Sequence, residues 1–225
     1  MKRLTQHMAA IGTDRSIQAV PEPTVRRMPG YLNLLREMLR REEQFVTAPA
    51  IAKLLHLDAT QVVKDLSYTG ISGKPRVGYL VTELVVALED FLGYNRTHEA
   101  FLVGAGYLGS ALIQYQGFRE SGLKIVAAFD IDKRKVGTEL AGVPVFHLDK
   151  FRDLASRLHI TIGILTTPAS AAQPIADLMV GWGIRAIWNF APIPLIVPEH
   201  VIVQDTHIYA NLAVILNKLK QAQAV

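Results

Sequence analysis

The sequence contains no cysteine, and this absence excludes disulfides, thiolate catalysis and cysteine-based metal sites. It also lacks any apolar run near the roughly 18 residues that would cross a bilayer. Residues 1–20 show no apolar segment followed by a small-residue cleavage site. We therefore expect a cytoplasmic protein with no membrane partner. Any redox sensing would have to work through a bound cofactor.

Acidic residues are scarce in the first third of the chain. Residues 1–80 hold 12 Lys and Arg against 7 Asp and Glu, a net charge of +5, whereas residues 81–225 hold 12 against 13, a net charge of −1. A basic region joined to a near-neutral one suggests a polyanionic partner for the basic region. Surface charge that only keeps the protein in solution is the alternative.

Helical periodicity begins near Pro29 and predicts an amphipathic first helix. Pro29 suits the first turn of this helix, because its fixed φ and missing N–H cost nothing there. The segment "YLNLLREMLRR" then repeats apolar residues at helical spacing. The predicted apolar stripe consists of Leu32, Leu35, Met38 and Leu39.

Two short helices joined by a tight turn are predicted next. Thr47 can cap the first of them, and Asp58 can cap the second, with Gln61 at the capping-box position and Gly70 ending it. This pattern fits a helix-turn-helix whose second helix enters the DNA major groove; a plain three-helix packing unit is the alternative. In the first short helix Ile51, Leu54 and Leu55 should point inward. The outward residues of the second would be Thr60, Gln61, Lys64 and Ser67, the types that contact bases and phosphates.

The segment "GISGKPRVGYLV" predicts a hairpin that resembles the basic wing of a winged helix. Its glycines and Pro75 bend the chain and place Lys74 and Arg76 at the tip, where they would contact phosphates. A plain hairpin is the alternative. The segment "TELVVALEDFLG" then predicts a helix that Thr82 caps and Gly93 ends.

From residue 100 onward, short apolar strands alternate with helices, the pattern of a parallel sheet with crossover helices. Strands are predicted at "AFLVGA", "KIVAAFD", "TIGILTT", "RAIWNF" and, more briefly, "HVIVQ". Helices are predicted at residues 107–117, 148–158, 169–181 and 206–221.

A glycine loop, "VGAGYLGSAL", follows the first of these strands and opens a helix. Gly104 permits a tight turn, Gly106 lets the backbone approach a pyrophosphate, and Gly109 lets the helix pack near the strand. Asp130 ends the second strand, where an acid accepts hydrogen bonds from the adenosine ribose and repels a 2′-phosphate. The loop therefore favours NAD(H), while the nearby cations Lys133, Arg134 and Lys135 leave its phosphorylated relative open.

A catalytic set to use the dinucleotide is missing. The seven histidines are scattered without an acid partner at a recognisable spacing, and no set of metal ligands stands out. The dinucleotide-binding part spans only about 125 residues, which leaves no room for a substrate domain. We therefore expect a protein that is not an enzyme. The alternatives are a small NAD-dependent oxidoreductase and a CoA- or nucleotide-binding module.

These patterns define the expected fold class, α/β, with an N-terminal winged helix-turn-helix domain, a Rossmann-type parallel-sheet domain and a C-terminal helix. The expected boundaries are a disordered tail at residues 1–23, the winged helix at 24–93, a linker at 94–99, the Rossmann domain at 100–204 and the last helix at 205–225.

The motifs "QVVKDLSYTGISGKPRVGY", "VGAGYLGSALIQYQGF", "AAFDIDKRKVG" and "NFAP" together resemble those of the Rex family of bacterial redox-sensing repressors. The resemblance runs from "RRMPGYL" at residue 26 to the last helix. It implies a homodimer that binds a palindromic double-stranded operator when NAD⁺ predominates and releases it when NADH binds. It also implies that the C-terminal helix is exchanged between subunits.

The resemblance implies two sets of site residues. The set expected to bind NADH or NAD⁺ comprises Gly104, Ala105, Gly106, Tyr107, Leu108, Gly109, Tyr115, Asp130, Lys135, Thr166, Thr167, Pro168, Asn189 and Ile208. The segments Thr166–Ala169 and Asn189–Pro192, which follow strands, are expected to line the cofactor crevice. The set expected to bind DNA comprises Arg26, Thr60, Gln61, Lys64, Ser67, Tyr68, Lys74 and Arg76.

The sequence also departs from the family's pattern. Val63 replaces an arginine that commonly precedes the lysine of the recognition helix, and Thr69 replaces a phenylalanine. Some members link cofactor state to DNA geometry through an arginine in the first helix and an Asp-Phe pair at the exchanged helix. Here these positions are Asn33, His207 and Ile208, so that switch does not transfer intact.

Overall fold

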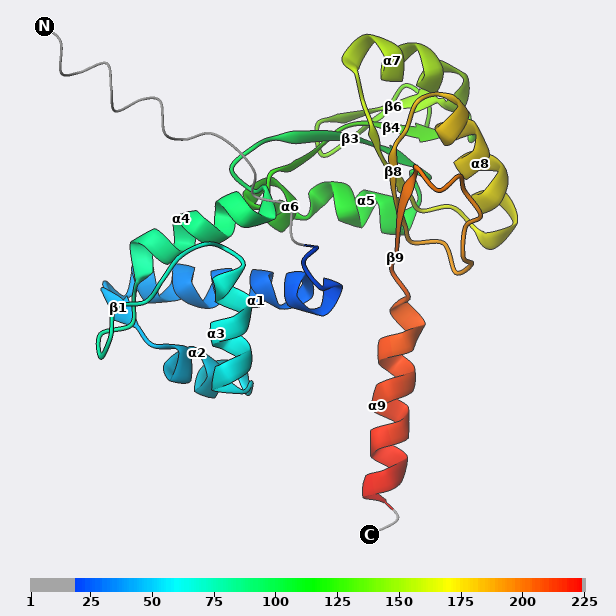
Figure 1. The fold of residues 1–225 in the computed structure, drawn as a ribbon. Helices are drawn as coiled ribbons and strands as arrows, with labels where there is room; N and C mark the ends of the chain where they lie inside the picture. The colour runs from blue at the N-terminus through cyan, green and yellow to red at the C-terminus, as the bar shows by residue number, and fades with distance from the viewer. Residues whose placement is uncertain (1–18, 224–225) are drawn as a thin grey trace, which may run out of the picture. The chain divides into compact units, whose positions relative to one another are not determined.

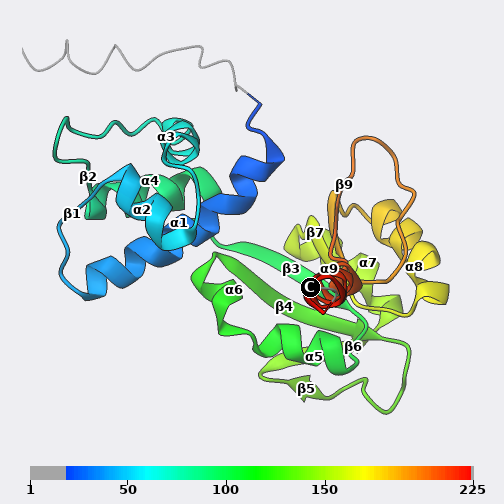
Figure 2. The same ribbon diagram turned by 90° about the horizontal axis from the view of Figure 1, so that it is seen from below.

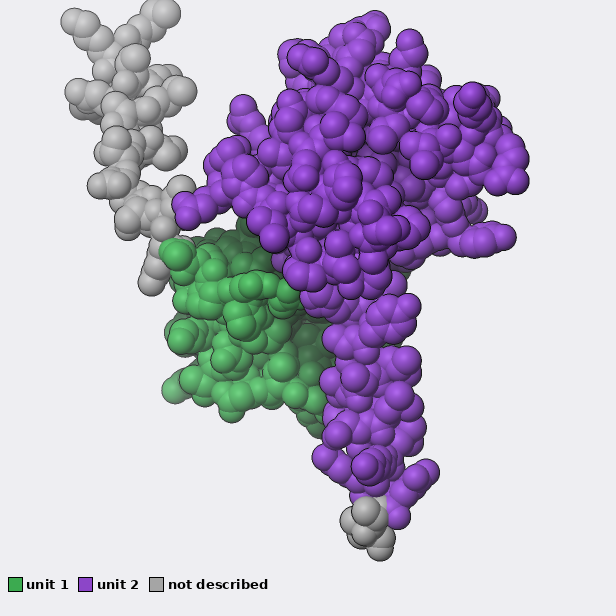
Figure 3. All heavy atoms as spheres, turned by 90° about the vertical axis from the view of Figure 1, so that its right-hand side faces the viewer, with its two compact units in different colours: residues 1–93 green, residues 94–225 purple. Residues whose placement is uncertain are grey.

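The computed structural model describes residues 19–223. The chain divides into two compact units, residues 1–93 and 94–225, which Figure 3 draws in two colours. Most of the predicted N-terminal tail, residues 1–18, lies outside the described residues.

The first unit is a helical bundle with a small two-stranded sheet. Its elements are α1 (Glu22–Arg40), β1 (Phe45–Val46), α2 (Ala48–Leu55), α3 (Ala59–Ser67), β2 (Tyr79–Leu80) and α4 (Val81–Leu92) (Figure 1). The predicted caps of both short helices form, because Thr47 accepts the N–H of Ala50 and Asp58 accepts those of Thr60 and Gln61. β1 and β2 pair antiparallel at the base of the hairpin between α3 and α4.

The first helix begins earlier than predicted. Pro23 takes the first-turn position that we assigned to Pro29, and Pro29 lies inside α1. A proline there removes one helical hydrogen bond. Burial of Thr24 and Met28 on the added turns favours the longer helix nonetheless. The tail prediction is therefore wrong for the residues that begin α1.

Three local predictions in this unit are also wrong. Leu54 does not point inward, since it is 55% exposed, whereas Ile51 is fully buried. Thr82 does not cap α4, which begins one residue before it and has no side-chain cap. Gln61 does not complete a capping box, because its amide donates to Asp65 at 2.7 Å instead.

The second unit is a doubly wound sheet. Its strands are β3 (His98–Val103), β4 (Leu123–Asp130), β5 (Glu139–Leu140), β6 (Val143–His147), β7 (Ile162–Leu165), β8 (Ala186–Asn189) and β9 (Ile202–Asp205). They lie in the order β5-β6-β4-β3-β7-β8-β9, and all pairs except β5–β6 are parallel. Leaving β5 aside, this is the 3-2-1-4-5-6 order of dinucleotide-binding folds.

The helices of this unit are α5 (Tyr107–Gln114), α6 (Gln116–Glu120), α7 (Phe151–Leu158), α8 (Ala169–Gly181) and α9 (Ile208–Ala222), with a 3₁₀ turn at Leu148–Lys150. All except α9 cover the two faces of the sheet. Figure 2 shows α7 and α8 on one side of the sheet and α5 and α6 on the other. Alternate residues of β3 enter the two cores, as strand geometry requires: Phe101 packs beside Phe151 of α7, and Leu102 is in the core with Ile113 of α5.

Several boundaries in the second unit differ from the predictions. β5 and β6 were not predicted, because Gly142 and Pro144 interrupt the apolar pattern of the segment that forms them. The helix predicted at 107–117 breaks at Tyr115, whose ψ of 107° is extended. β3 begins at His98, inside the predicted linker.

The last helix stands apart from the other elements of its unit. α9 has no buried residue, and its large apolar side chains are about half exposed. Within residues 19–223, no helix is both long and apolar enough to cross a membrane.

Candidate functional site

A cavity of about 840 Å³ opens where the parallel strands of the second unit end. The ends of β3 and β4 contribute to its wall, as do the segments that follow β7, β8 and β9. This is the crevice where open parallel sheets bind their ligands. Nine residues of the predicted cofactor set line it: Gly104, Gly106, Leu108, Asp130, Lys135, Thr166, Thr167, Pro168 and Ile208.

The glycine loop forms one wall of this cavity, through Gly104, Gly106 and Leu108. Gly104 has a φ of +106°, and a Cβ there would lie 2.7 Å from the carbonyl oxygen of Thr166. A Cβ on Gly109 would lie 2.2 Å from the carbonyl oxygen of Gly104. Gly106 differs, because its Cβ would meet no protein atom within 4 Å. The fold of the protein itself thus requires glycine at positions 104 and 109, whereas Gly106 leaves open space for a ligand.

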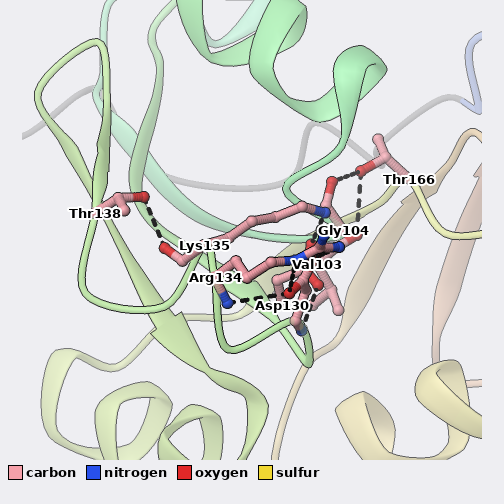
Figure 4. A network of polar contacts seen from close by, with 8 residues as sticks. Val103, Gly104, Asp130, Arg134, Lys135, Thr138 and Thr166 are labelled. Atoms are coloured by element: carbon pink, nitrogen blue, oxygen red, sulfur yellow. Dashed lines mark hydrogen bonds and ion pairs between the residues drawn. The ribbon is translucent and has the colours of Figure 1, made fainter.

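A threonine hydroxyl ties the loop to the neighbouring strand end. Thr166 Oγ1 lies 2.7 Å from the Gly104 carbonyl oxygen and 3.1 Å from that of Val103 (Figure 4). The hydroxyl has one proton to donate, so the two carbonyls share it. This contact holds the turn between β3 and α5 in place.

Asp130, at the end of β4, is ready to accept hydrogen bonds from a ligand. Its Oδ2 lies 2.8 Å from Lys135 Nζ, and its Oδ1 accepts the N–H of Asp132 at 2.9 Å (Figure 4). Burial favours a raised pKa, but the hydrogen bonds from Lys135 and from the backbone of Asp132 and Ala105 outweigh it and lower the pKa of Asp130. The carboxylate therefore stays ionised at neutral pH.

Thr167 provides an unpartnered polar atom in the cavity wall. Its side chain is buried, and within residues 19–223 its Oγ1 has no hydrogen-bond partner. A buried hydroxyl without a partner is costly, and a ligand in the cavity would remove that cost. Together with Gly106 and Asp130, this atom fits a polar ligand of dinucleotide type.

Five predicted cofactor residues lie off the cavity wall: Ala105, Tyr107, Gly109, Tyr115 and Asn189. Asn189 is fully buried, and its Nδ2 donates to Ile193 O and to Asp205 Oδ1. Its Oδ1 accepts the N–H of Ala191. Asn189 therefore fixes the loop after β8 and has no group left for a cofactor, so we no longer assign it to the cofactor.

The segment after β8 lines the cavity as predicted, through Phe190 and Pro192. The sequence prediction missed Thr206, His207 and Tyr209, which follow β9. Their position directly after strands is the signal that could have found them, since parallel strands end at one edge. Most of the other missed residues are apolar: Val103, Phe129, Ile131, Leu148, Ala171 and Ile175.

The first unit presents a second candidate site along α3. Thr60, Lys64 and Ser67 are exposed on this helix, as predicted, whereas Gln61 and Tyr68 are half-buried. Arg26 of α1 is also exposed, although it pairs with Glu22 one turn away at 2.6 Å. Lys74 and Arg76, the other predicted DNA-binding residues, are both exposed in the hairpin.

The hairpin after α3 is a tight turn. Lys74 and Gly78 exchange backbone hydrogen bonds at 2.7 and 2.9 Å, and Arg76 has a φ of +63° at its tip. A Cβ on Gly78 would lie 2.2 Å from the carbonyl oxygen of Val46, so the hairpin packs closely on β1. The two cations are therefore carried on a short, well-anchored wing.

A buried carboxylate joins α3 to α1. Asp65 is fully buried and accepts hydrogen bonds from Arg27 at 2.6 and 2.8 Å and from Tyr31 at 2.6 Å. Thr24 and Gln61 donate to the same group at 3.0 and 2.7 Å. Burial favours a raised pKa, but these donors outweigh it and hold the pKa of Asp65 at about 2. No local sequence pattern marks Asp65, because its partners lie up to 41 positions away.

No metal centre is found in residues 19–223, where no group of three or more His, Asp and Glu side chains is placed to hold an ion.

Two known families match separate parts of the chain. Residues 19–67 match the putative DNA-binding protein N-terminus, and residues 95–193 match the CoA binding domain. The boundary between the matches falls where the structure divides into its two units.

Relatives match nearly the whole chain. The redox-sensing transcriptional repressor Rex of Bacteroides thetaiotaomicron is 50% identical over 89% of this chain and 91% of its own. The Rex of Treponema denticola is 46% identical over 90% of this chain and 99% of its own. These relatives are named as regulators, not as enzymes.

Solved structures of RSP, a Rex-family repressor, match as well. RSP with β-NAD⁺ and operator DNA is 34% identical over 92% of this chain and 95% of its own, with a TM-score of 0.86. RSP with β-NADH is 34% identical over 91% of this chain and 96% of its own, with a TM-score of 0.83. The chain therefore belongs to the Rex family of redox-sensing transcriptional repressors.

Proposed function

We propose that this chain represses transcription by binding operator DNA through its first unit, and that NADH bound in its second unit releases the DNA. The observation that carries the proposal is the pairing, in one chain, of a dinucleotide cavity with an exposed helix and basic wing. RSP, similar over nearly its whole length, has been seen with β-NADH and with β-NAD⁺ and operator DNA.

In the cofactor site, the loop Gly104–Gly109 would hold the pyrophosphate at the start of α5, and Asp130 the adenosine ribose. Thr167 would hydrogen-bond the ligand through its unpartnered Oγ1. Lys135 keeps Asp130 ionised and beside the cavity. The nicotinamide ring is positively charged when oxidised and neutral when reduced, and this difference is the signal that the bound group supplies.

In the DNA site, α3 would enter the major groove with Lys64 at a base edge or a phosphate. The wing residues Lys74 and Arg76 would contact phosphates beside it, because both are exposed cations on a short hairpin. The remaining proposed contacts are Arg26, Thr60, Gln61, Ser67 and Tyr68.

The second proposed feature is a homodimer that exchanges α9. The apolar side chains of this helix, Leu212, Ile215, Leu216 and Leu219, are each about half exposed. So much apolar surface on one helix favours a covering partner. A two-fold dimer would match a palindromic operator. A repressor of this kind would act in the cytoplasm.

The proposal is tested by a gel shift with duplexes that the protein selects from a random pool, at fixed total NAD(H) and varied NADH fraction. We expect a shift with NAD⁺ that disappears as NADH replaces it. No shift at any ratio would contradict the proposal. Incubation with NADH and a panel of carbonyl compounds tests the oxidoreductase alternative, which turnover would support.

CoA binding is a second candidate, because residues 95–193 match the CoA binding domain. Asp130 argues against it, since its carboxylate is placed to accept ribose hydroxyls and would repel the phosphate on the ribose of CoA. Calorimetry with NADH, NAD⁺, NADPH and CoA separates the two. Tightest binding by CoA would favour the second candidate.

A further inference from the structure

Helix α3 carries an exposed apolar side chain, that of Val63, on the face proposed to meet DNA. Val63 of α3 is 49% exposed, although Val62 just before it and Leu66 one turn after it are fully buried in the core. A single exposed valine is ordinary on a protein surface. Its surroundings make this one informative.

Val63 lies in the polar and basic surface of the first unit. It lines a hollow of about 580 Å³ between α3, the start of α2 and the wing, together with Ser67, Lys74 and Arg76. Lys64 follows it on the helix and is exposed as well. Val63 is therefore an exposed apolar side chain surrounded by polar and basic side chains of the types that contact DNA.

A valine offers a base no hydrogen bond, so it can distinguish bases only by apolar contact. In the major groove, the one apolar group that marks a base is the 5-methyl of thymine. We propose, on the basis of the proposed operator binding, that Val63 reads a thymine methyl in each operator half-site. It would thereby act as a specificity-determining residue of α3.

The size of the effect follows from the burial of one methyl group. Removing that methyl should weaken binding about fourfold for each half-site and about fifteenfold for a two-fold dimer on a palindrome. The same loss should follow from shortening the valine. The two losses should not add, because both remove one contact.

The test uses the full-length protein with NAD⁺ and duplexes that it selects from a random pool. Each thymine pair related by the two-fold axis is replaced in turn by deoxyuridine, which lacks only the methyl. Affinities are measured by fluorescence anisotropy for the wild type, Val63→Ala and Val86→Ala. Val86 is a matched control, since it lies on α4 of the same unit, is 65% exposed and does not line the hollow.

We expect one deoxyuridine pair that weakens wild type and Val86→Ala about fifteenfold but leaves Val63→Ala nearly unaffected. A scan in which no position matters, or in which the sensitive position is equally sensitive in Val63→Ala, would overturn the inference. The proposed function would survive that result, because selection and the NADH response would remain. Failure to select any duplex would instead overturn both. NADH affinity and thermal unfolding check that each variant is folded.

Discussion

The two units build their sites by different means. In the first unit, side chains set the geometry, since one buried carboxylate, Asp65, joins α3 to three side chains of α1, those of Thr24, Arg27 and Tyr31. In the second unit, the backbone sets it, because Gly104 and Gly109 allow main-chain atoms to approach within distances that a Cβ would not permit. We therefore expect that the proposed DNA site can change its specificity by exchanging exposed residues, whereas the glycine loop tolerates little change.

Removal of the Asp65 carboxylate should have the largest effect of the changes considered, because side chains set the geometry of the first unit. Asp65→Ala leaves Arg27 and the buried Tyr31 hydroxyl without their acceptor, and we expect a loss of about 3 kcal/mol in the unfolding free energy of the first unit. Arg27 keeps 27% of its side chain exposed, which places the loss at the lower end for buried pairs. Urea unfolding measures it.

Two controls sharpen that prediction. Glu22→Ala removes an exposed ion pair of α1 and should cost less than about 1 kcal/mol. The pKa of Asp65 is about 2 when folded and about 3.9 in an unfolded chain, so its stabilisation is present above about pH 4 and is lost as the pH falls towards 2. Asp65→Asn should flatten that acid dependence. Equal costs for Asp65→Ala and Glu22→Ala would show that the carboxylate does not hold the unit together.

Two glycine substitutions test whether the backbone sets the geometry of the cofactor loop in the second unit. Gly109→Ala places a Cβ 2.2 Å from the Gly104 carbonyl oxygen, so the second unit should lose about 2–3 kcal/mol of stability, and NADH binding with it. Gly106→Ala meets no protein atom and should leave stability unchanged while weakening NADH binding. Thermal unfolding and calorimetry measure both. If Gly106→Ala bound NADH normally, the loop would not approach the pyrophosphate there.

The sequence predicted what local patterns determine. Thr47 and Asp58 cap their helices within three residues, and Asp130 ends a strand that its apolar run marks. It did not predict features that depend on distant partners. The central role of Asp65 is set by donors on α1, and Asn189 bonds to Asp205 across neighbouring strands.

Patterns interrupted by glycine or proline were also misread. β6 carries Pro144 near its start and pairs with the short β5, so its apolar run is brief. The sequence pattern predicts a helix start at Pro29, yet burial of Met28 outweighs the hydrogen bond that proline removes. Tertiary packing decided both cases.

Asp130→Ala should have a smaller effect, confined to the cofactor. It removes a ribose acceptor and a negative charge, so NADH should bind about tenfold more weakly and discrimination against NADPH should narrow, since Lys135 is freed. Calorimetry with both ligands measures this, and Asp153→Ala, an exposed acid on α7, is the control. Unchanged affinities for both ligands would contradict the assignment.

The smallest effect is expected at the wing. Lys74→Ala should weaken DNA binding nearly equally for all sequences. It should also reduce the slope of the logarithm of the binding constant against the logarithm of the salt concentration by about one per wing. Lys64→Ala should instead cost about 1–3 kcal/mol and relax the preference at one operator position if it reads a base. Anisotropy titrations at several salt concentrations distinguish them, with Lys124→Ala of the second unit as control. If the two variants lost affinity equally for all sequences, the proposal that Lys64 of α3 reads a base while Lys74 of the wing contacts phosphate would be wrong.

DNA and NADH should each weaken the binding of the other to this protein, and measurements of both affinities test this antagonism. Operator affinity is measured with and without saturating NADH, and NADH affinity with and without saturating operator. Because linkage is reciprocal, NADH should weaken DNA binding by the same factor as DNA weakens NADH binding, and NAD⁺ should show no such antagonism. NADH binding that left the operator affinity unchanged would contradict the account.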